Sequence, residues 1–187
     1  MNRQLFEGEL VRLVAPEPDR DAPTLSRWTH DAEFMQLMGS APLRPLSPSQ
    51  VKKEYEPGDE EASFRFLIQT RATERMIGFI RLVSVGWSHG FSALEVGIGE
   101  PAERNKGYGS EALGMLLRFA FDELNLHRVG AVVPGYNDGA LRFFQRAGFV
   151  VEARRREAIH RFGRRWEALH LGVLRGEWQN SMQGGRA

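Results

Sequence analysis

Cysteine is absent from this chain of 187 residues. Its absence excludes disulfide bonds, a thiolate nucleophile and cysteine-ligated zinc, and it is typical of proteins in a reducing compartment. No stretch approaches the ~18 consecutive apolar residues of a membrane-spanning helix, and residues 1–10 lack the apolar core of a secretory signal. We therefore expect a cytoplasmic protein with no membrane partner.

The chain also lacks an excess of charge of either sign. Its 25 Lys and Arg residues nearly balance its 24 Asp and Glu residues, which gives a formal net charge of +1 at pH 7. Such a balance provides no overall attraction to nucleic acids or anionic membranes, and we expect no nucleic-acid partner. The five histidines show no ligand spacing such as H-E-x-x-H, and we predict no metal site.

The composition is that of an ordinary globular domain with a hydrophobic core. Hydrophobic residues make up 42% of the chain and charged residues 26%. The length suits one domain, and no repeat or shift in composition marks a boundary. We predict a single domain over residues 1–178, followed by a polar tail at 179–187 that we expect to be frayed.

Apolar periodicity predicts a mixture of strands and helices. Strands are expected at residues 9–14, 64–69, 76–85, 94–98, 129–133, 149–151, 154–160 and 166–174, and helices at 22–38, 50–56, 110–124 and 138–147. Polar turns between neighbouring strands predict hairpins, the last of them around Phe162 and Gly163. Asn137 is a good N-cap and Gly148 a good C′ residue for the helix at 138–147.

A glycine-rich loop, R-N-K-G-Y-G at residues 104–109, lies between a predicted strand and a predicted helix. Gly107 and Gly109 can adopt positive φ and allow a ligand close to the backbone, while the helix directs unpaired N–H groups at the loop. Arg104 and Lys106 add positive charge. Because no Gly-Lys-Ser/Thr follows, this is not a P-loop. The segment predicts a phosphate-binding site.

The strand before this loop has two unlike faces. By period two, Leu94, Val96 and Ile98 share one face, which we expect in the core. The other face carries one carboxylate, Glu95, and otherwise only alanine and glycine. A ligand arm could lie there against Gly97 and the rest of the nearly bare backbone.

The order of the elements and their motifs resembles the GNAT superfamily of N-acyltransferases, in particular the branch of ribosomal-protein-type N-acetyltransferases. The resemblance covers about residues 9–178. It is carried by L-E-V-G at 94–97, the loop at 104–109 with S-E-A-L, N-L-H-R-V at 125–129, Asn137 with Ala140, F-Q-R-A-G-F at 144–149 and W-E-A-L-H-L-G-V-L at 166–174. It implies an α+β, three-layer α/β fold: a mixed, mostly antiparallel sheet with helices on both faces and a splayed central pair of parallel strands.

The same resemblance implies an N-acetyltransferase. Acetyl-CoA would be the cosubstrate, without a metal, and its acetyl group would pass to a primary amine by direct attack in a ternary complex. The acceptor would be a peptide or protein N-terminus, or a small amine. The implied acetyl-CoA site consists of Val96, Gly97, Ile98, Arg104, Asn105, Lys106, Gly107, Tyr108, Gly109, Ser110, Asn137 and Phe144, and the pantetheine arm would lie on the Gly97 face.

Acetyl transfer needs a neutral amine, but an α-amino group has a pKa of ~8 and lysine one of ~10.4. A base or a water chain must therefore remove a proton. Glu95 is the best-placed candidate, and relatives resembling this protein often carry a glutamate here. A carboxylate that orients the substrate or has only a structural role explains the residue equally well.

The family often has a tyrosine acid where this chain has Phe144, which cannot donate a proton. The role is then vacant, or is filled by water or by Tyr136, although a tyrosine beside a helix cap is usually a packing residue. A thiol pKa of ~8.5 lets a thiolate leave without a strong acid. A backbone N–H between Val96 and Ile98 would stabilise the developing oxyanion. Asn137 can both cap its helix and hydrogen-bond the cofactor arm, as in relatives.

Three other functions fit isolated features. Residues 86–90, G-W-S-H-G, match a hydrolase nucleophile elbow, but a strand follows the serine. Residues 107–112 fit the dinucleotide fingerprint of a Rossmann oxidoreductase, but hairpins precede them and no acidic residue ends the strand at Val133. A non-catalytic acyl-CoA-binding regulatory domain is favoured by Phe144, and opposed by Glu95 and the intact loop.

Two charged clusters remain. Glu152 and Glu157 are interleaved with arginines at positions 154–156, 161, 164 and 165, and the segment lacks an aromatic stacking series, which favours a solvated hairpin over an RNA site. The resemblance places the acceptor over residues 22–55. An acidic stretch next to this region could attract a cationic amine or a peptide N-terminus, although an exposed run of charges is usually a solvated face: Glu54, Glu56, Asp59, Glu60 and Glu61.

Overall fold

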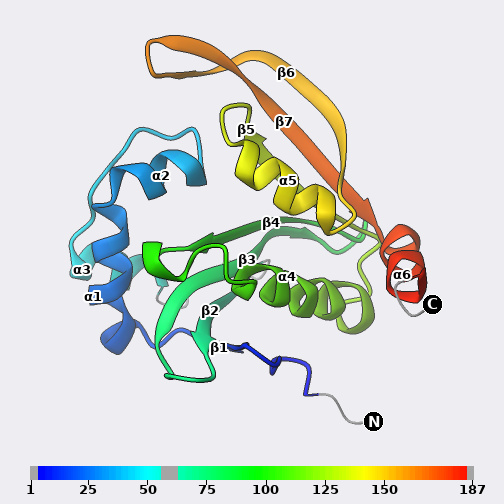
Figure 1. The fold of residues 1–187 in the computed structure, drawn as a ribbon, viewed down its shortest axis with the longest axis horizontal. Helices are drawn as coiled ribbons and strands as arrows, with labels where there is room; N and C mark the ends of the chain where they lie inside the picture. The colour runs from blue at the N-terminus through cyan, green and yellow to red at the C-terminus, as the bar shows by residue number, and fades with distance from the viewer. Residues whose placement is uncertain (1–3, 56–62, 185–187) are drawn as a thin grey trace.

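The computed structural model describes residues 4–55 and 63–184. These residues form a seven-stranded sheet in the order β1-β2-β3-β4-β5-β7-β6 (Figure 1). Its strands are β1 (Val11–Val14), β2 (Phe64–Thr70), β3 (Met76–Gly86), β4 (Phe91–Ile98), β5 (Arg128–Pro134), β6 (Val150–Arg161) and β7 (Arg164–Leu174).

The helices are α1 (Pro18–Thr29), α2 (Ala32–Met38), α3 (Pro48–Tyr55), α4 (Tyr108–Arg118), α5 (Asp138–Arg146) and α6 (Arg175–Gly184), with a 3-10 turn η1 (Pro101–Glu103) and a π-helical turn η2 (Phe119–Glu123). The single helix predicted at 22–38 is wrong. The Asp31 side chain accepts a hydrogen bond from Phe34 N at 3.0 Å and starts a second helix. The tail is helical rather than frayed as far as residue 184, and 185–187 lie outside the described residues.

Only one neighbouring pair in the sheet is parallel, namely β4 and β5. Their ladder joins residues 91–93 to residues 128–130 and continues no further. Beyond Ala93 the carboxyl half of β4 therefore has no strand partner on that side. This confirms the predicted mixed, mostly antiparallel sheet with a splayed central pair.

Helices cover both faces of the sheet, as predicted. Successive residues of a strand point to opposite faces, and Leu67 packs in a cluster with α1, α2 and α3, whereas Ile68 packs in the cluster that contains α4 and α5. The first cluster includes the buried side chains of Trp28 and Phe34. The structure thus has three layers: helices, the sheet and helices (Figure 1). Within the sheet layer, β4 and β5 diverge after their short paired segment.

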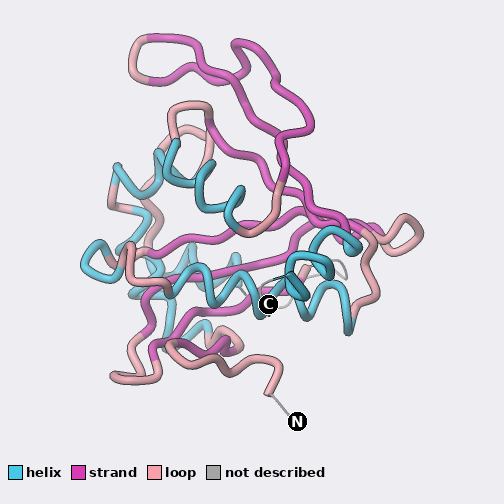
Figure 2. Tube along the Cα trace, turned by 45° about the vertical axis from the view of Figure 1, so that its right-hand side comes forward, coloured by secondary structure: helices cyan, strands magenta, loops and turns pink. Residues whose placement is uncertain are grey.

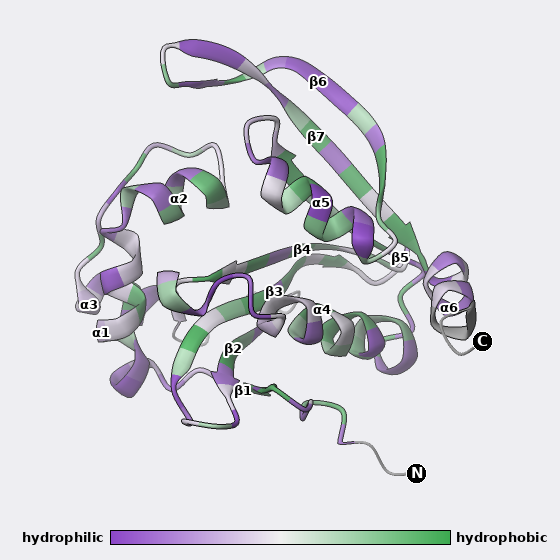
Figure 3. Ribbon diagram, viewed as in Figure 1, coloured by the Kyte–Doolittle hydropathy of each residue, from purple (hydrophilic) through white to green (hydrophobic). Residues whose placement is uncertain are grey.

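The last two strands form the longest hairpin, which extends away from the body of the molecule (Figure 2). Its turn, Phe162 and Gly163, has φ of 53° and 71°, the positive values that a two-residue hairpin turn requires. The two short strands predicted at 149–151 and 154–160 are one strand, β6, with irregular pairing at two points. Residues 152–158 are exposed and largely hydrophilic (Figure 3).

The hairpin of β3 and β4 removes two alternative functions. Ser88 lies in its turn, where Gly90 N donates to Gly86 O at 2.8 Å, and the antiparallel strand β4 follows instead of a supporting helix. The Rossmann interpretation fails because β4, which precedes the glycine loop, is antiparallel to β3 in a mostly antiparallel sheet.

Candidate active site

The glycine loop ends in an open helix terminus. Gly107, the N-cap of α4, has a φ of 87° and supplies no side-chain cap. The first turn-closing bond runs from Glu111 N to Gly107 O, so the N–H groups of Tyr108, Gly109 and Ser110 have no partner within the helix. Gly109 does not adopt a positive φ, contrary to expectation, because it is already part of α4. The arrangement suits an anion at the positive end of the helix.

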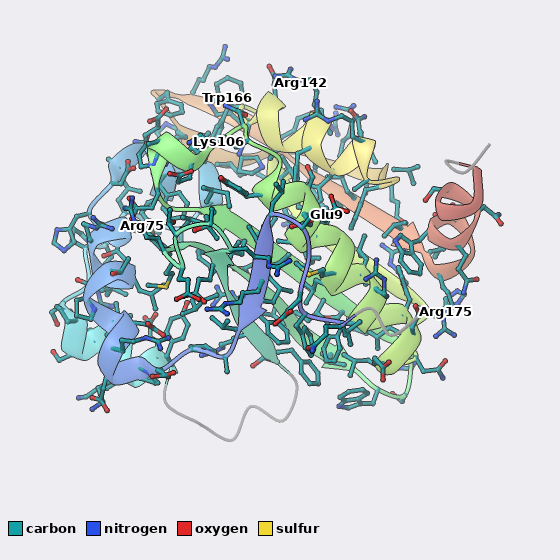
Figure 4. The ribbon with its side chains drawn as sticks, turned by 60° about the horizontal axis from the view of Figure 1, so that its bottom comes forward. Glu9, Arg75, Lys106, Arg142, Trp166 and Arg175 are labelled. Atoms are coloured by element: carbon teal, nitrogen blue, oxygen red, sulfur yellow. The ribbon has the colours of Figure 1, made fainter. Side chains whose placement is uncertain are left out.

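The start of α4 makes hydrogen bonds to a segment about 100 residues earlier in the chain. The carboxylate of Glu111 accepts hydrogen bonds from the backbone N–H groups of Glu9, Leu10 and Val11 at 2.6, 2.8 and 2.7 Å; Figure 4 labels Glu9. Gly8 leaves the space that this carboxylate needs. The start of α4 is therefore tied to the edge strand of the sheet.

Both cations of the loop are paired with carboxylates. Arg104 donates to Ile98 O at 3.2 Å, forms an ion pair with Asp31 at 3.4 Å and lies over the Phe34 ring. It thereby joins the loop to β4 and α2. Lys106 forms an ion pair with Glu103 at 2.9 Å; Figure 4 shows it in the loop.

A larger cavity of about 600 Å³ opens where β4 and β5 diverge. Every residue of the predicted acetyl-CoA set except Lys106 lines it, and so does Glu95. The set that the structure brings together is Glu95, Val96, Gly97, Ile98, Arg104, Asn105, Gly107, Tyr108, Gly109, Ser110, Asn137 and Phe144.

Sequence reasoning missed other residues of this cavity. They are Phe34, Leu37 and Met38 of α2, Leu94, Glu103, Val132, Val133 and Pro134, and Gly139, Ala140, Phe143 and Arg146 of α5. The helical period of α5 could have indicated its contribution, since these positions lie within one or two turns of Asn137 and Phe144. The contribution of α2 depends on tertiary packing and leaves no local signal.

The backbone of β4 faces the larger cavity along its free edge. Gly99 N donates to Ile77 O at 2.9 Å, so by antiparallel alternation Gly97 and Glu95 bond to β3. Val96 then directs its N–H and C=O to the opposite edge, and no β5 residue pairs with it. This free N–H is a candidate for the oxyanion donor that we expect between Val96 and Ile98, and that role stays a prediction.

The face of β4 that carries Glu95 is not bare. A Cβ atom at Gly97 would lie 2.7 Å from Met38 Sδ and 3.0 Å from the Phe34 ring, and one at Gly99 would collide with Trp28. The glycines make room for side chains of α1 and α2. The expectation that a pantetheine arm lies on this face is therefore wrong, and the larger cavity follows the strand edge instead.

Glu95 forms an ion pair with Arg81, its direct cross-strand neighbour on β3. Arg81 Nε and Nη2 donate to the same oxygen, Glu95 Oε2, at 2.9 and 2.6 Å. Glu95 Oε1 has no hydrogen-bond partner in residues 4–55 and 63–184, and the side chain is 41% exposed. The carboxylate is thus held in place by one oxygen and available through the other.

A smaller cavity of about 280 Å³ lies on the other side of Glu95. Phe34, Met38 and Glu95 line both cavities. Most of the smaller cavity is apolar, with walls from α1, α2, α3 and β3, and its polar groups include Tyr55 and Arg81. Burial raises the pKa of Tyr55, while the nearby guanidinium groups of Arg81 and Arg65 act in the opposite direction. The acidic stretch predicted beside this region lies outside the described residues, apart from Glu54.

The remaining candidates are held by structural contacts. Phe144 is only 6% exposed and packs against Phe143 and Phe149. Tyr136 donates its hydroxyl to Gln36 O at 2.7 Å, which ties it to α2. Asn137 caps α5 through Ala140 N at 2.9 Å and donates to Leu37 O at 2.9 Å, so both ends of its amide are engaged. Of these three side chains, Asn137 and Phe144 line the larger cavity.

Within the described ranges no cluster of His, Cys, Asp and Glu side chains suits a metal ion. Over the same ranges, none of the helices has the length and apolarity that crossing a membrane requires.

Comparison with known proteins agrees with this geometry. Residues 11–150 match the family described as the acetyltransferase (GNAT) domain. The SPbeta prophage-derived N-acetyltransferase YokL of Bacillus subtilis (strain 168) is 28% identical over 80% of this chain and 82% of its own length. A spermidine N(1)-acetyltransferase of Vibrio cholerae is 25% identical over 65% of this chain and 69% of its own length. The crystal structure of a Vibrio cholerae spermidine N-acetyltransferase in complex with CoA and spermine has the same fold, with a TM-score of 0.83 at 21% identity, covering 92% of this chain and all of that one.

Proposed function

This chain belongs to the GNAT family of acetyltransferases, which use acetyl-CoA as cosubstrate, and we propose that it acetylates a primary amine bound in the smaller cavity. The observation that carries the proposal is the position of Glu95, which lines both cavities. A donor in the larger cavity and an acceptor in the smaller one would meet at this residue. That arrangement favours direct transfer in a ternary complex.

The larger cavity fits acetyl-CoA in three ways. The open N-terminus of α4 offers backbone N–H groups at Tyr108, Gly109 and Ser110 to a pyrophosphate. The free edge of β4 offers the N–H and C=O of Val96 to the amide groups of the pantetheine arm or to the thioester carbonyl. Arg146 of α5 adds a cation to the lining.

The reaction requires an amine nitrogen to attack the thioester carbonyl while its proton leaves. We assign proton acceptance, directly or through water, to Glu95 Oε1, since Oε2 is occupied by Arg81. The charge that develops on the carbonyl oxygen would meet the N–H of Val96. A thiolate, with a thiol pKa of ~8.5, can leave without a protein acid, which suits a site where Phe144 replaces the family's tyrosine.

The proposal also specifies the class of amine that accepts the acetyl group. The resemblance to the ribosomal-protein-type branch favours a protein N-terminus, whereas the Vibrio cholerae relative is named for spermidine. The smaller cavity, at about 280 Å³ and with mostly apolar walls, favours a small amine over a folded protein.

A thiol-release assay with acetyl-CoA tests the proposal. The panel should contain spermidine, amino acids, simple alkylamines, aminoglycosides and short peptides with free N-termini. We expect CoA release that depends on at least one of these amines. Tight binding of acetyl-CoA without release by any of them would favour the non-catalytic acyl-CoA-binding domain instead.

Replacement of Glu95 by glutamine tests the assigned base. The amide keeps the shape and can still accept from Arg81, but it cannot take a proton. We expect kcat/KM to fall about 100-fold or more, with the greatest loss at low pH, where least free amine is present. Rates should be measured from about pH 6 to about pH 9, on either side of an α-amine pKa of ~8. Full activity across that range would show that Glu95 is not the base.

A further inference from the structure

The ion pair of Arg81 and Glu95 leaves hydrogen-bonding groups of both side chains without a partner among the described residues. Both printed bonds end on Glu95 Oε2 and begin at Arg81 Nε and Nη2, the side edge of the guanidinium. The end edge, formed by Nη1 and the second hydrogen of Nη2, has no partner in the described part of the chain. The pair therefore presents an unused carboxylate oxygen and an unused bidentate donor in the same cavity.

The two residues that carry the unused groups both line the smaller cavity. Arg81 is 30% exposed and Glu95 41% exposed, so neither is sealed in the core. Phe79 lies under the Arg81 guanidinium at 5.6 Å from its ring centroid, which fixes the plane of the fork. Two strands thus hold the opposite charges at a fixed cross-strand position.

The rest of the cavity wall is apolar. Its side chains come from three helices and from β3: Leu25, Trp28, Phe34, Met35, Met38, Leu46, Val51 and Phe79. Tyr55 also lines it, and the described residues provide no hydrogen-bond partner for its hydroxyl. Because burial raises its pKa, this phenol stays protonated and can donate to an anion.

We propose, on the basis of the function proposed above, that the acceptor is a zwitterionic α-amino acid with an apolar or aromatic side chain. Its amino group lies at Glu95 Oε1, its carboxylate binds the free end of Arg81, and its side chain occupies the apolar wall. The zwitterion then lies antiparallel to the ion pair. All four charges are compensated, which lowers the cost of removing them from water.

The transfer balances without a further reactant. The amine nitrogen forms an amide bond with the acetyl carbon as the carbon–sulfur bond breaks, and the electron pair leaves on the CoA sulfur. The ammonium group of the zwitterion gives up two protons by way of Glu95 to solvent, one before the attack and one as the amide forms. The CoA thiolate takes one proton from solvent, so one proton is released per turnover. The products are an N-acetyl amino acid and CoA.

The charges of the cavity oppose a polyamine acceptor. Among the described residues that line it, the carboxylates are Glu54, which is exposed, and Glu95, which is already paired with a cation. A polyamine brings several positive charges and no anion, so its second ammonium would meet Arg81. An amine with its own carboxylate avoids this repulsion.

The test uses a matched series of acceptors with the wild-type protein: L-phenylalanine, L-phenylalaninamide and 2-phenylethylamine, with spermidine as a fourth. Rates are compared per concentration of free amine, because these amines differ in pKa. We expect kcat/KM for the amino acid to exceed that for 2-phenylethylamine by about 10- to 100-fold, the effect of one bidentate charged interaction. Equal rates for the amino acid and its amide would overturn the role of the carboxylate.

A second experiment repeats the acceptor series with the Arg81→Lys variant. Lysine keeps a cation beside Glu95 but cannot form the bidentate fork. The rate with the amino acid is divided by the rate of the same variant with 2-phenylethylamine, which cancels any effect of the substitution on Glu95, and this ratio should shrink about tenfold or more. Arg12→Lys is the matched control, because Arg12 bonds Gln69 and Glu74 and lines neither cavity. A preference unchanged in Arg81→Lys would refute the assignment.

The two proposals fail in different ways. Preferred turnover of spermidine or 2-phenylethylamine would overturn the amino-acid acceptor and leave the acetyltransferase intact. Absence of turnover with every amine would overturn both.

Discussion

Gly107 has the strictest backbone requirement in the larger cavity, because its φ of 87° is one that side-chain-bearing residues rarely adopt. We expect Gly107→Val to cost about 1–2 kcal/mol of stability and to weaken acetyl-CoA binding at least tenfold, since relaxing the strain turns the N–H groups of the loop away. Titration calorimetry with CoA, together with urea unfolding, would measure both effects.

Gly114→Ala is the control for this substitution. Gly114 lies in the same helix, and nothing lies within 4 Å of the position that its Cβ would take. Alanine there should leave CoA binding unchanged and raise helix stability by up to about 1 kcal/mol. Unchanged CoA affinity in Gly107→Val would contradict the placement of the phosphates.

At Phe144 the question is whether the reaction needs a protein acid. If it does not, the wild-type protein should transfer acetyl groups in a single turnover, and Phe144→Tyr should change the rate by less than about tenfold, well below the ~10² to 10⁴ of general acid catalysis. Rapid-quench measurement of both proteins, with an acceptor found in the screen, decides the point. Activity that appears only in the tyrosine variant would mean that the native chain has lost catalysis.

Several residues of the site follow from local rules of sequence. Asn137 as a cap, Gly107 with a positive φ and the alternation of β4 all depend on neighbours within a few positions. Arg81 was missed because its relation to Glu95 depends on the register of two strands separated by a turn. No period along the chain shows which residue lies opposite which.

Among the elements, α4 depends on a contact distant in sequence. Glu111→Gln would remove one of the two carboxylate oxygens that accept from the backbone of Glu9, Leu10 and Val11, and would place an amide NH₂ against an N–H group. We expect a loss of about 1.5–3 kcal/mol in the free energy of unfolding. Denaturant unfolding measures it, with Glu123→Gln as control.

Glu123 is exposed, one helical segment further on, and its replacement should cost less than about 0.5 kcal/mol. Equal stability of the two variants would show that the Glu111 contact contributes nothing.

Element boundaries show where periodicity succeeds and where it fails. The sequence predicts β2 and β3 to within one residue at each end, because their alternating pattern and turn chemistry agree, whereas β4 begins three residues before its predicted start. The sequence predicts one helix at 22–38 where the structure has two, because apolar spacing continues on both sides of the break. Asp31 is recognisable as the N-cap of α2 only from the turn of the chain that precedes it. Side chains of α2 line both cavities. Their position there depends on the tertiary packing of α2 and has no local signal in the sequence.

For the molecule as a whole, binding of acetyl-CoA should raise stability, because the ligand binds a site that exists only in the folded chain. At a concentration about 100 times its Kd, the gain is about 2.7 kcal/mol. Thermal unfolding with acetyl-CoA and with pantetheine, which lacks the phosphates, separates the loop contribution from the rest. An equal shift from both ligands would contradict phosphate binding at α4.

The π-helical turn η2, at the far end of the helical segment that begins at the glycine loop, packs against both ends of the chain. Phe119 lies 5.4 Å from Phe6, and Phe121 lies 5.3 Å from Trp178 of α6, measured between ring centroids. Exopeptidase digestion that reaches Phe6 or Trp178 would therefore have to separate an aromatic pair before it could continue. Since α4 leads directly from the glycine loop into η2, a ligand that holds the loop should slow digestion from both directions.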